Sequence, residues 1–210
     1  MSLSPVYLKS RHFSSLIDKC RIKLKGWTLT LSFSGRIELI KSVMLGIISY
    51  WIQSFHFPVS IYNELDRLCA NFLWKGQMHA WKWEYICWPK TEGGVGLRRI
   101  QDINQAARSK ILWNFCTSNS IWANWMKDHY LKGKRIWQIK PNPMNSFVWK
   151  NSTVARQVAS VHMYQNSSDK WLWLASPNCL FSLTSSWNIA RPYAPLFDLA
   201  EVIWFPYHNP

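Results

Sequence analysis

The stretch WKWEYICWPKTEGGVGLRRIQDINQAARSKILWNF, residues 81–115, joins an aromatic segment to a glycine-rich turn and a helical segment. Large residues alternate over 81–87, a pattern that predicts a strand. Residues 89–96 predict a tight turn, because proline cannot continue a ladder and glycine permits positive φ angles. A helix is expected from about Asp102, a residue type favoured at N-caps. The turn therefore links an aromatic wall to an arginine pair just before the helix.

The same stretch carries a family resemblance. W-x-x-I-C-W-P-K-x-x-G-G-V-G-L-R, followed by N-x-A, resembles the segment after the polymerase core in plant non-LTR (LINE-type) retrotransposon reverse transcriptases. Four further blocks agree in the family's order, at 16–27, 31–44, 71–76 and 182–191. The resemblance thus covers nearly the whole chain. The matching residues of the central stretch are Cys87, Pro89, Lys90, Gly93, Gly94, Gly96, Leu97, Arg98, Asn104, Ala106 and Trp113, with Lys110 near the family's helix lysine.

The resemblance implies a position within a larger enzyme. The early helices would correspond to the polymerase thumb, which holds the primer–template duplex by its phosphates. The family's catalytic aspartates, in a Y-x-D-D signature that binds two metal ions, would precede residue 1, and no such motif occurs here. Residues 182–191 resemble the entry to the family's zinc-binding module, whose Cys/His cluster the chain lacks. We therefore expect a fragment of an RNA-directed DNA polymerase that is not itself an enzyme and needs no cofactor.

The charge of the chain indicates a polyanionic partner. Lysine and arginine number 25 against 11 aspartates and glutamates, a net charge of +14. Such a balance is typical of nucleic-acid binding first and of anionic membrane surfaces second. No apolar run reaches the roughly 18 residues of a membrane span. We expect binding to RNA and DNA, as an RNA–DNA hybrid or a duplex backbone. The predicted phosphate contacts are Lys19, Lys23, Arg36, Lys41, Arg98, Arg99 and Lys110.

Each of these contacts has a plainer alternative. Lys19 and Lys23 flank an amphipathic helix and are either solvated or directed at a nucleic-acid backbone. The glycine turn matches no nucleotide-binding fingerprint, so it either grips one phosphate through its arginines or is a tight hairpin that exposes them. Lys110 falls on the helical face of Ala106 and Ala107, where it either extends past a packed helix or points at a ligand.

Apolar spacing predicts a mainly α fold, a helical bundle. Helical stripes run over 13–24, 34–55 and 60–73, with Ser34 and Ser60 as the expected N-caps of the last two. Gly46 lies inside the second stripe, which suggests close packing or a bend there. Three further helices are expected, at 120–131 after Ser120, at 147–161 and starting at 185–190. A small β-hairpin is predicted near 81–100 and a short two-stranded element near 171–183, from strands at 171–174 and 180–183.

The domain organisation follows from these elements. Residues 1–131 form the expected thumb-like region with the central hairpin, 132–146 a basic linker, and 147–210 the start of the truncated zinc-binding-like region. The linker contains prolines and a set of bases among aromatic residues, so it could also track a single strand. Those bases are Lys132, Lys134, Arg135 and Lys140.

Other classes of chemistry leave little trace in the sequence. The five cysteines form no CxxC pair and the six histidines are scattered, so no metal site and no disulfide framework are expected. The rival readings are a decayed retroelement product without function and a scaffold that binds a protein or a membrane. Localisation is expected to be intracellular, nuclear or cytoplasmic, without a choice between them. A thumb without its palm should expose apolar surface and therefore self-associate.

Overall fold

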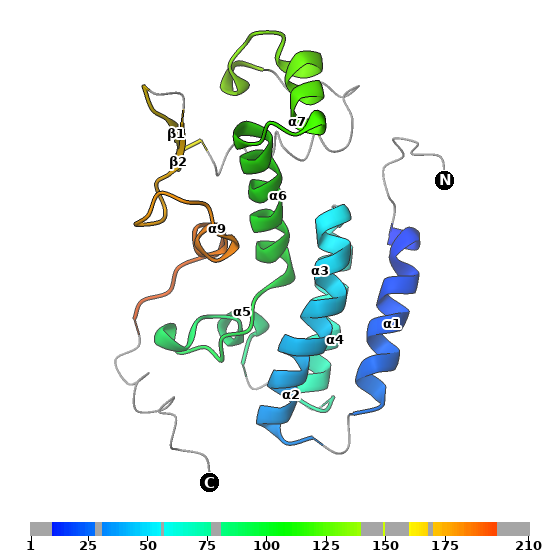
Figure 1. Ribbon diagram of the computed structural model, residues 1–210. Coiled ribbons are helices and arrows are strands. Elements are labelled where there is room, and N and C mark those ends of the chain that lie inside the picture. The colour runs from blue at the N-terminus through cyan, green and yellow to red at the C-terminus, as the bar shows by residue number, and fades with distance from the viewer. Residues whose placement is uncertain are drawn as a thin grey trace. The chain divides into compact units, whose positions relative to one another are not determined.

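A computed structural model of the 210-residue chain describes residues 10–27, 31–55, 57–76, 81–139, 149, 160–167 and 170–196 (Figure 1). The chain divides into two compact units, which are described separately. Unit 1 comprises Met1–Val6 and Asn104–Arg191, and unit 2 comprises Tyr7–Ile103 and Pro192–Pro210. The fold is mainly α with a small two-stranded antiparallel sheet, as predicted from the apolar spacing.

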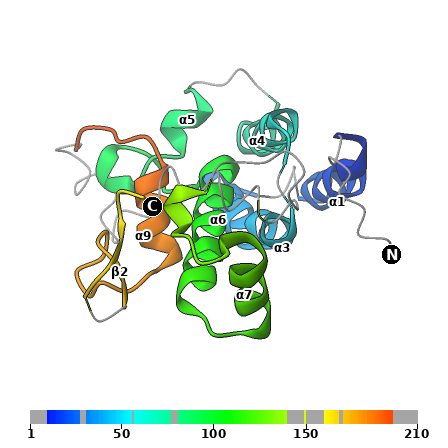
Figure 2. The same ribbon diagram turned by 90° about the horizontal axis from the view of Figure 1, so that it is seen from above.

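Unit 2 is built from helices. In chain order they are η1 (Ser10–Phe13), α1 (Ser14–Lys25), α2 (Phe33–Leu39), η2 (Ile40–Met44), α3 (Leu45–Ser54), α4 (Val59–Leu73), α5 (Trp83–Ile86), η3 (Lys90–Glu92) and the start of α6 (Ile100–Thr117). Helix α1 contacts α4, and α4 contacts α2. Figure 2 shows α1, α3 and α4 nearly end-on.

The core of unit 2 comes from the predicted apolar stripes. Leu16, Cys20 and Leu24 of α1 are buried, as are Leu65 and Leu73 of α4. Burial of a leucine or isoleucine side chain stabilises a fold by about 1.5–3 kcal/mol relative to an exposed position. The stripes at 13–24 and 60–73 therefore form a real core. The expected N-cap at Ser60 is wrong, because α4 already begins at Val59, after Pro58.

The stripe at 34–55 forms a helix in three parts. Ser32, not Ser34, caps α2, and its hydroxyl accepts a hydrogen bond from the Gly35 amide at 3.2 Å. The central part, η2, is a π-helix, a wider turn that often marks functional sites. Gly46 follows in α3, and a Cβ there would have no atom within 4 Å. Of the two alternatives expected at Gly46, close packing is therefore wrong, and a bend stays a prediction.

The β-hairpin predicted near 81–100 is not formed. Residues 83–86 make one helical turn, α5, in which the Cys87 amide donates to the Trp83 carbonyl at 3.1 Å. The helical turn buries Ile86 and Cys87 together. A strand would have placed these adjacent residues on opposite faces. Helix α6 also begins earlier than expected, so Asp102 lies in its first turn.

Unit 1 combines helices with the small sheet. Its elements are the rest of α6, α7 (Ile121–Met126), η4 (Lys127–Leu131), η5 (Ile136–Gln138), β1 (Met163–Gln165), β2 (Trp171–Trp173) and α9 (Leu183–Ala190). Strands β1 and β2 pair antiparallel, with Tyr164 opposite Leu172. Residues 171–173 were predicted as a strand correctly. Residues 180–183 were not, because Ser182 there caps α9 and its hydroxyl accepts from the Ser185 amide at 3.0 Å.

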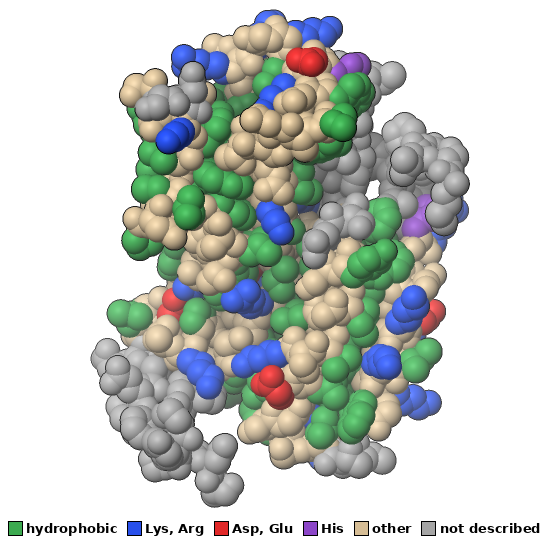
Figure 3. All heavy atoms as spheres, in the orientation of Figure 1, with side chains coloured by type: hydrophobic (Ala, Val, Ile, Leu, Met, Phe, Trp, Pro, Cys, Tyr) green, Lys and Arg blue, Asp and Glu red, His purple; other side chains and the backbone are tan. Residues whose placement is uncertain are grey.

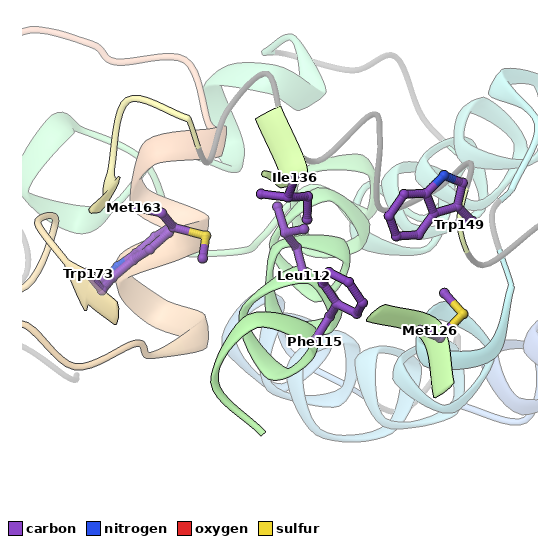
Figure 4. Packing of buried hydrophobic residues seen from close by; sticks show 7 residues of the cluster. All are labelled: Leu112, Phe115, Met126, Ile136, Trp149, Met163 and Trp173. Carbon is purple, nitrogen blue, oxygen red and sulfur yellow. The ribbon is translucent and has the colours of Figure 1, made fainter. Parts of the chain in front are cut away.

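Aromatic and aliphatic side chains form the core of unit 1 (Figure 4). Phe115 of α6 meets Trp149 edge to face, with ring centroids 5.5 Å apart. Trp173 of β2 is fully buried, and its indole N–H donates to the Ser185 hydroxyl at 2.9 Å. The buried set is Leu112, Phe115, Met126, Ile136, Trp149, Met163 and Trp173.

Two predicted segments are only partly visible. The helix expected at 147–161 lies outside the described residues except for Trp149 and residues 160–161. Of the expected linker at 132–146, the described part ends at residue 139, and within it Ile136 is buried in the core of unit 1. The division into a thumb-like region, linker and zinc-binding-like region stays a prediction. None of the helices within the described ranges is both long and apolar enough to cross a membrane.

Candidate nucleic-acid interface

The glycine turn of unit 2 has a conformation that requires glycine. Gly93 and Gly96 have φ angles of +84° and +72°, in the left-handed region that side chains disfavour. Gly94 is needed for a different reason, since a Cβ there would overlap the backbone carbonyl of Trp88. The three glycines therefore allow the chain to fold back tightly on residues 86–89.

The turn uses its amides internally. The amides of Gly94, Val95 and Gly96 donate to backbone carbonyls at 3.0, 3.0 and 2.9 Å. A phosphate-binding loop instead directs free amides at its ligand. This geometry agrees with the absence of a nucleotide fingerprint. The buried Glu92 carboxylate closes the turn further by accepting from the Ala194 amide at 3.2 Å.

Lys41 is the predicted contact that the fold brings to the turn. It lies in the π-helix η2 and is half-buried. A Cβ at Gly96 would be 3.9 Å from Lys41 Nζ and 3.7 Å from Cγ of Lys90. Two lysine side chains thus flank the last glycine before Arg98, although Lys41 is more than 50 residues away in sequence.

Arg98 and Arg99 are adjacent in sequence but differ in exposure and in their contacts. Arg98 is exposed, whereas Arg99 is half-buried and its guanidinium lies 3.3 Å from Glu84 Oε1. Arg99 also faces the carboxyl of Asp66. Burial raises the pKa of Asp66 to about 6, and the charge of Arg99 opposes that rise. Arg99 therefore serves unit 2 as a structural cation.

Two of the predicted phosphate contacts lie on helix α1, and both are accessible. Lys19 and Lys23 are both exposed and stand four residues apart, so they share one helix face. Their neighbour Arg21 is paired, at 2.9 Å from Asp18 and 3.5 Å from Glu64. Lys19 and Lys23 have the access that a phosphate contact needs.

Arg36 has a different setting. It is 7% exposed, and its Nε and Nη1 have no hydrogen-bond partner in the described part of the chain. Exposure of this guanidinium would be needed before it could meet a duplex. Lys110, in unit 1, is exposed on α6, while Ala106 and Ala107 of the same helix are buried.

Sequence reasoning missed a groove in unit 1. Its volume is about 1160 Å³, and it lies between the end of α6, the segment 131–137 and the hairpin formed by β1 and β2. Lys127, Lys134, Arg135 and Lys170 line it, and no carboxylate is among its described lining residues. The sequence did indicate one wall of the groove, because the basic linker segment was predicted to be able to bind a single strand. The opposite wall comes from residues 163–167, 170 and 171, and no pattern in the sequence connects them to the linker segment.

Two of the cysteines lack the environment of a reactive thiol. Burial raises the pKa of the Cys116 thiol to about 12, although the charge of Lys127 acts against the rise. Burial also raises the pKa of Cys20, to about 11. Both thiols are therefore protonated near neutral pH, and a thiol is a poor nucleophile. Within the described ranges, no three His, Cys, Asp or Glu side chains gather at metal-binding distance.

Comparison with known proteins gives one informative likeness. The chain is 33% identical over 159 residues to an Arabidopsis thaliana protein named "Putative ribonuclease H protein At1g65750". The match takes in 70% of this chain and 26% of that protein, so the chain spans about a quarter of the length of its curated relative. No family profile matches the chain.

Proposed function

We propose that the chain is a non-catalytic segment of a plant retroelement protein that binds the backbone of nucleic acid. In a complete reverse transcriptase, such a segment would hold the primer–template during RNA-directed DNA synthesis. The sequence blocks shared with LINE-type enzymes support this, as does the relative whose name refers to an enzyme of nucleic acid. The observation that carries this proposal is the surplus of lysine and arginine over acidic residues, with exposed basic side chains in each unit (blue in Figure 3).

The duplex contacts proposed are the accessible members of the predicted set. Lys19, Lys23, Arg98 and Lys110 are exposed, and Lys41 reaches the glycine turn. A cation contributes to affinity mainly by releasing counterions from phosphates, and this requires access to the backbone. Arg99 and Arg36 are proposed to contribute through the fold instead, because one is paired with Glu84 and the other is buried.

A salt titration tests this function. Binding of the full chain to an RNA–DNA hybrid, duplex DNA and single-stranded RNA would be followed by fluorescence anisotropy from low to physiological salt. We expect affinity to fall steeply with salt for the hybrid and the duplex. A Lys41→Gln/Arg98→Gln/Lys110→Gln variant should flatten the slope for duplex DNA by about 2 to 3, or roughly 0.9 per lost contact.

A control variant has the same change of charge. Arg67, Lys75 and Lys82 are exposed cations outside the proposed contacts, and their triple glutamine variant should keep the wild-type slope. Equal losses in both variants would mean that only net charge matters. A folded chain that binds none of the three nucleic acids would overturn the proposal and favour a decayed product or a protein- or membrane-binding scaffold.

Two further measurements address the rival readings. Cleavage of the RNA strand in the same hybrid would reveal a ribonuclease activity like the one that the relative's name describes. Light scattering tests the predicted self-association, for which α7 offers the exposed Ile121, Trp122 and Trp125. A monomer at high concentration would contradict that prediction.

A further inference from the structure

The groove of unit 1 has an apolar floor and a positively charged rim. Phe115, Ile136 and Met163 at its floor belong to the core of the unit and are buried. Lys134, Arg135 and Lys170 at the rim are exposed, and none forms an ion pair with a carboxylate in the described residues. A concave surface with one sign of charge attracts a polyanion and holds it in place.

The two walls of the groove are fixed by hydrogen bonds. The Lys134 amide donates to the Leu131 carbonyl at 2.9 Å, and the Arg135 amide donates to the Gln138 side chain at 3.2 Å. On the other side, the Asn166 side chain accepts from the Lys170 amide at 2.9 Å. Lys127 has a supporting role, since its ammonium donates to the Ser118 carbonyl at 3.1 Å. The backbone that carries the rim cations is therefore hydrogen-bonded locally, while their exposed side chains lose rotamer freedom on binding.

Aromatic rings stand among these cations. Trp137 is 37% exposed and meets Trp171 at 6.3 Å between ring centroids, with an interplanar angle of 67°. Tyr164 of β1 is 55% exposed on the same lining. Exposed rings beside cations match the requirements of unpaired bases, which stack on the rings while their phosphates meet the charges. A duplex offers its phosphates but keeps its bases stacked inside.

We infer that this groove binds single-stranded nucleic acid, with Trp137 and Tyr164 as stacking surfaces and Lys134, Arg135 and Lys170 as phosphate contacts. This inference rests on the proposed function and adds a site for unpaired strand to it. The groove is large for this purpose, because typical small-ligand pockets have volumes of about 300–1,000 Å³ and this one has about 1160 Å³. It has room for more than one base.

The test uses the full chain and a fluorescein-labelled U12 oligoribonucleotide. A Lys134→Gln/Arg135→Gln/Lys170→Gln variant should bind U12 at least tenfold more weakly. Its log–log salt slope should flatten by about 2, at roughly 0.7 per single-strand contact. The Arg67→Gln/Lys75→Gln/Lys82→Gln variant loses the same charge and should keep the U12 affinity. Circular dichroism and thermal melting check that both variants fold.

Stacking has its own readout. Tyr164→Ser and Trp137→Leu should each weaken U12 binding several-fold and leave duplex DNA binding unchanged. Tyr164 is the more exposed of the two rings, so the Tyr164→Ser variant still tests stacking if Trp137→Leu disturbs the fold. An abasic 12-mer, which keeps the phosphates without the bases, should bind about tenfold more weakly than U12, within the 1–3 kcal/mol per base typical of stacking.

The outcomes separate this inference from the proposed function. If the groove variant and the control variant bind U12 equally well, the inference that the groove binds single strands is wrong. The proposed binding of the chain to nucleic-acid backbone would be unaffected. Equal binding of U12, the abasic strand and polyglutamate would mean that the groove accepts any polyanion and would also overturn it. If the wild-type chain binds U12 but not the RNA–DNA hybrid, the proposed duplex binding is wrong and the inference about the groove still holds.

Discussion

Unit 1 and unit 2 carry their positive charge differently. Unit 2 has 14 lysines and arginines against nine aspartates and glutamates, whereas unit 1 has 11 against two, so their net charges are +5 and +9. In unit 2, Arg21 and Arg99 are paired with carboxylates. In unit 1, no carboxylate is among the described residues that line the groove. The net charge of a whole chain therefore does not show which of its cations are available to a partner.

The largest expected effect tests whether the glycine turn of unit 2 is structural. Gly94→Ala should destabilise the protein by more than about 4 kcal/mol or prevent folding, because its Cβ would overlap the Trp88 carbonyl. Urea denaturation followed by near-UV circular dichroism measures the change. A stable Gly94→Ala protein would mean that the turn can relax and that glycine is not required at this position.

The next effect concerns a charge kept inside unit 2. Burial raises the pKa of Asp66 to about 6, so between pH 4 and pH 6 the folded protein binds a proton that the unfolded chain releases. This contribution stabilises the protein below pH 4 and is lost as pH rises through 6. Asp66→Asn removes the titration. The stability of the variant relative to wild type should rise by about 2–3 kcal/mol from pH 4 to pH 7, at about 1.4 kcal/mol per pKa unit.

Chemical denaturation at several pH values measures that difference. A constant gap between Asp66→Asn and the wild type would show that Asp66 titrates normally. Asp66 would then behave like a carboxylate on the surface, and it would not be an example of a charge buried inside unit 2.

A smaller effect is expected inside unit 1. Ser185→Ala should cost about 1–2 kcal/mol, since it leaves the buried indole N–H of Trp173 without its partner at 2.9 Å. Ser182→Ala removes the α9 cap and leaves that indole bond in place, so it is a matched control costing about 1 kcal/mol. The Ser185 hydroxyl also belongs to the capping box with Ser182, so thermal melting measures the indole bond as the loss by which Ser185→Ala exceeds Ser182→Ala. Identical losses would mean that only the cap matters.

The smallest effect concerns a glycine without a structural task. Gly46→Ala in α3 should stabilise the protein by up to about 1 kcal/mol, because alanine favours helix and no atom lies within 4 Å. The same denaturation experiment measures it. A loss of stability would mean that α3 needs backbone freedom at this point, and the contrast with Gly94 would disappear.

The sequence predicted the elements with long apolar periodicity. The stripes at 13–24 and 60–73 are buried as expected, and Ser120 caps α7, accepting from the Ala123 amide at 3.2 Å. The aromatic run at 81–87 was assigned to the wrong element, because a short run of large residues fits a strand and a helical turn equally well. Only tertiary packing, which buries Ile86 and Cys87 together, decides between them.

The candidate sites were less accessible to sequence reasoning. Exposed lysines such as Lys19 and Lys23 follow from helical spacing, but the burial of Arg36 and the pairing of Arg99 with Glu84 depend on residues distant in the chain. The groove was missed for the same reason. Its described walls, at 131–137 and at 163–167 with 170 and 171, are separated by a long stretch of sequence, and no periodic pattern relates them.

The π-helix η2 has a consequence for how the gene can change. Ile40, Met44, Ile48 and Ile52 are all buried and lie four residues apart. In a regular α-helix, each four-residue step turns the side chain by roughly 40° around the axis, so such a series would wind away from the core. The wider turn takes back part of that rotation. The π turn already absorbs the roughly 100° that one extra residue adds, so loss of one codon among residues 41–43 would restore a regular helix and leave α3 close to its present orientation relative to α2. Such an in-frame deletion would thus keep the buried side chains on the core face, whereas a one-residue deletion inside α3 would turn every following side chain by roughly 100°.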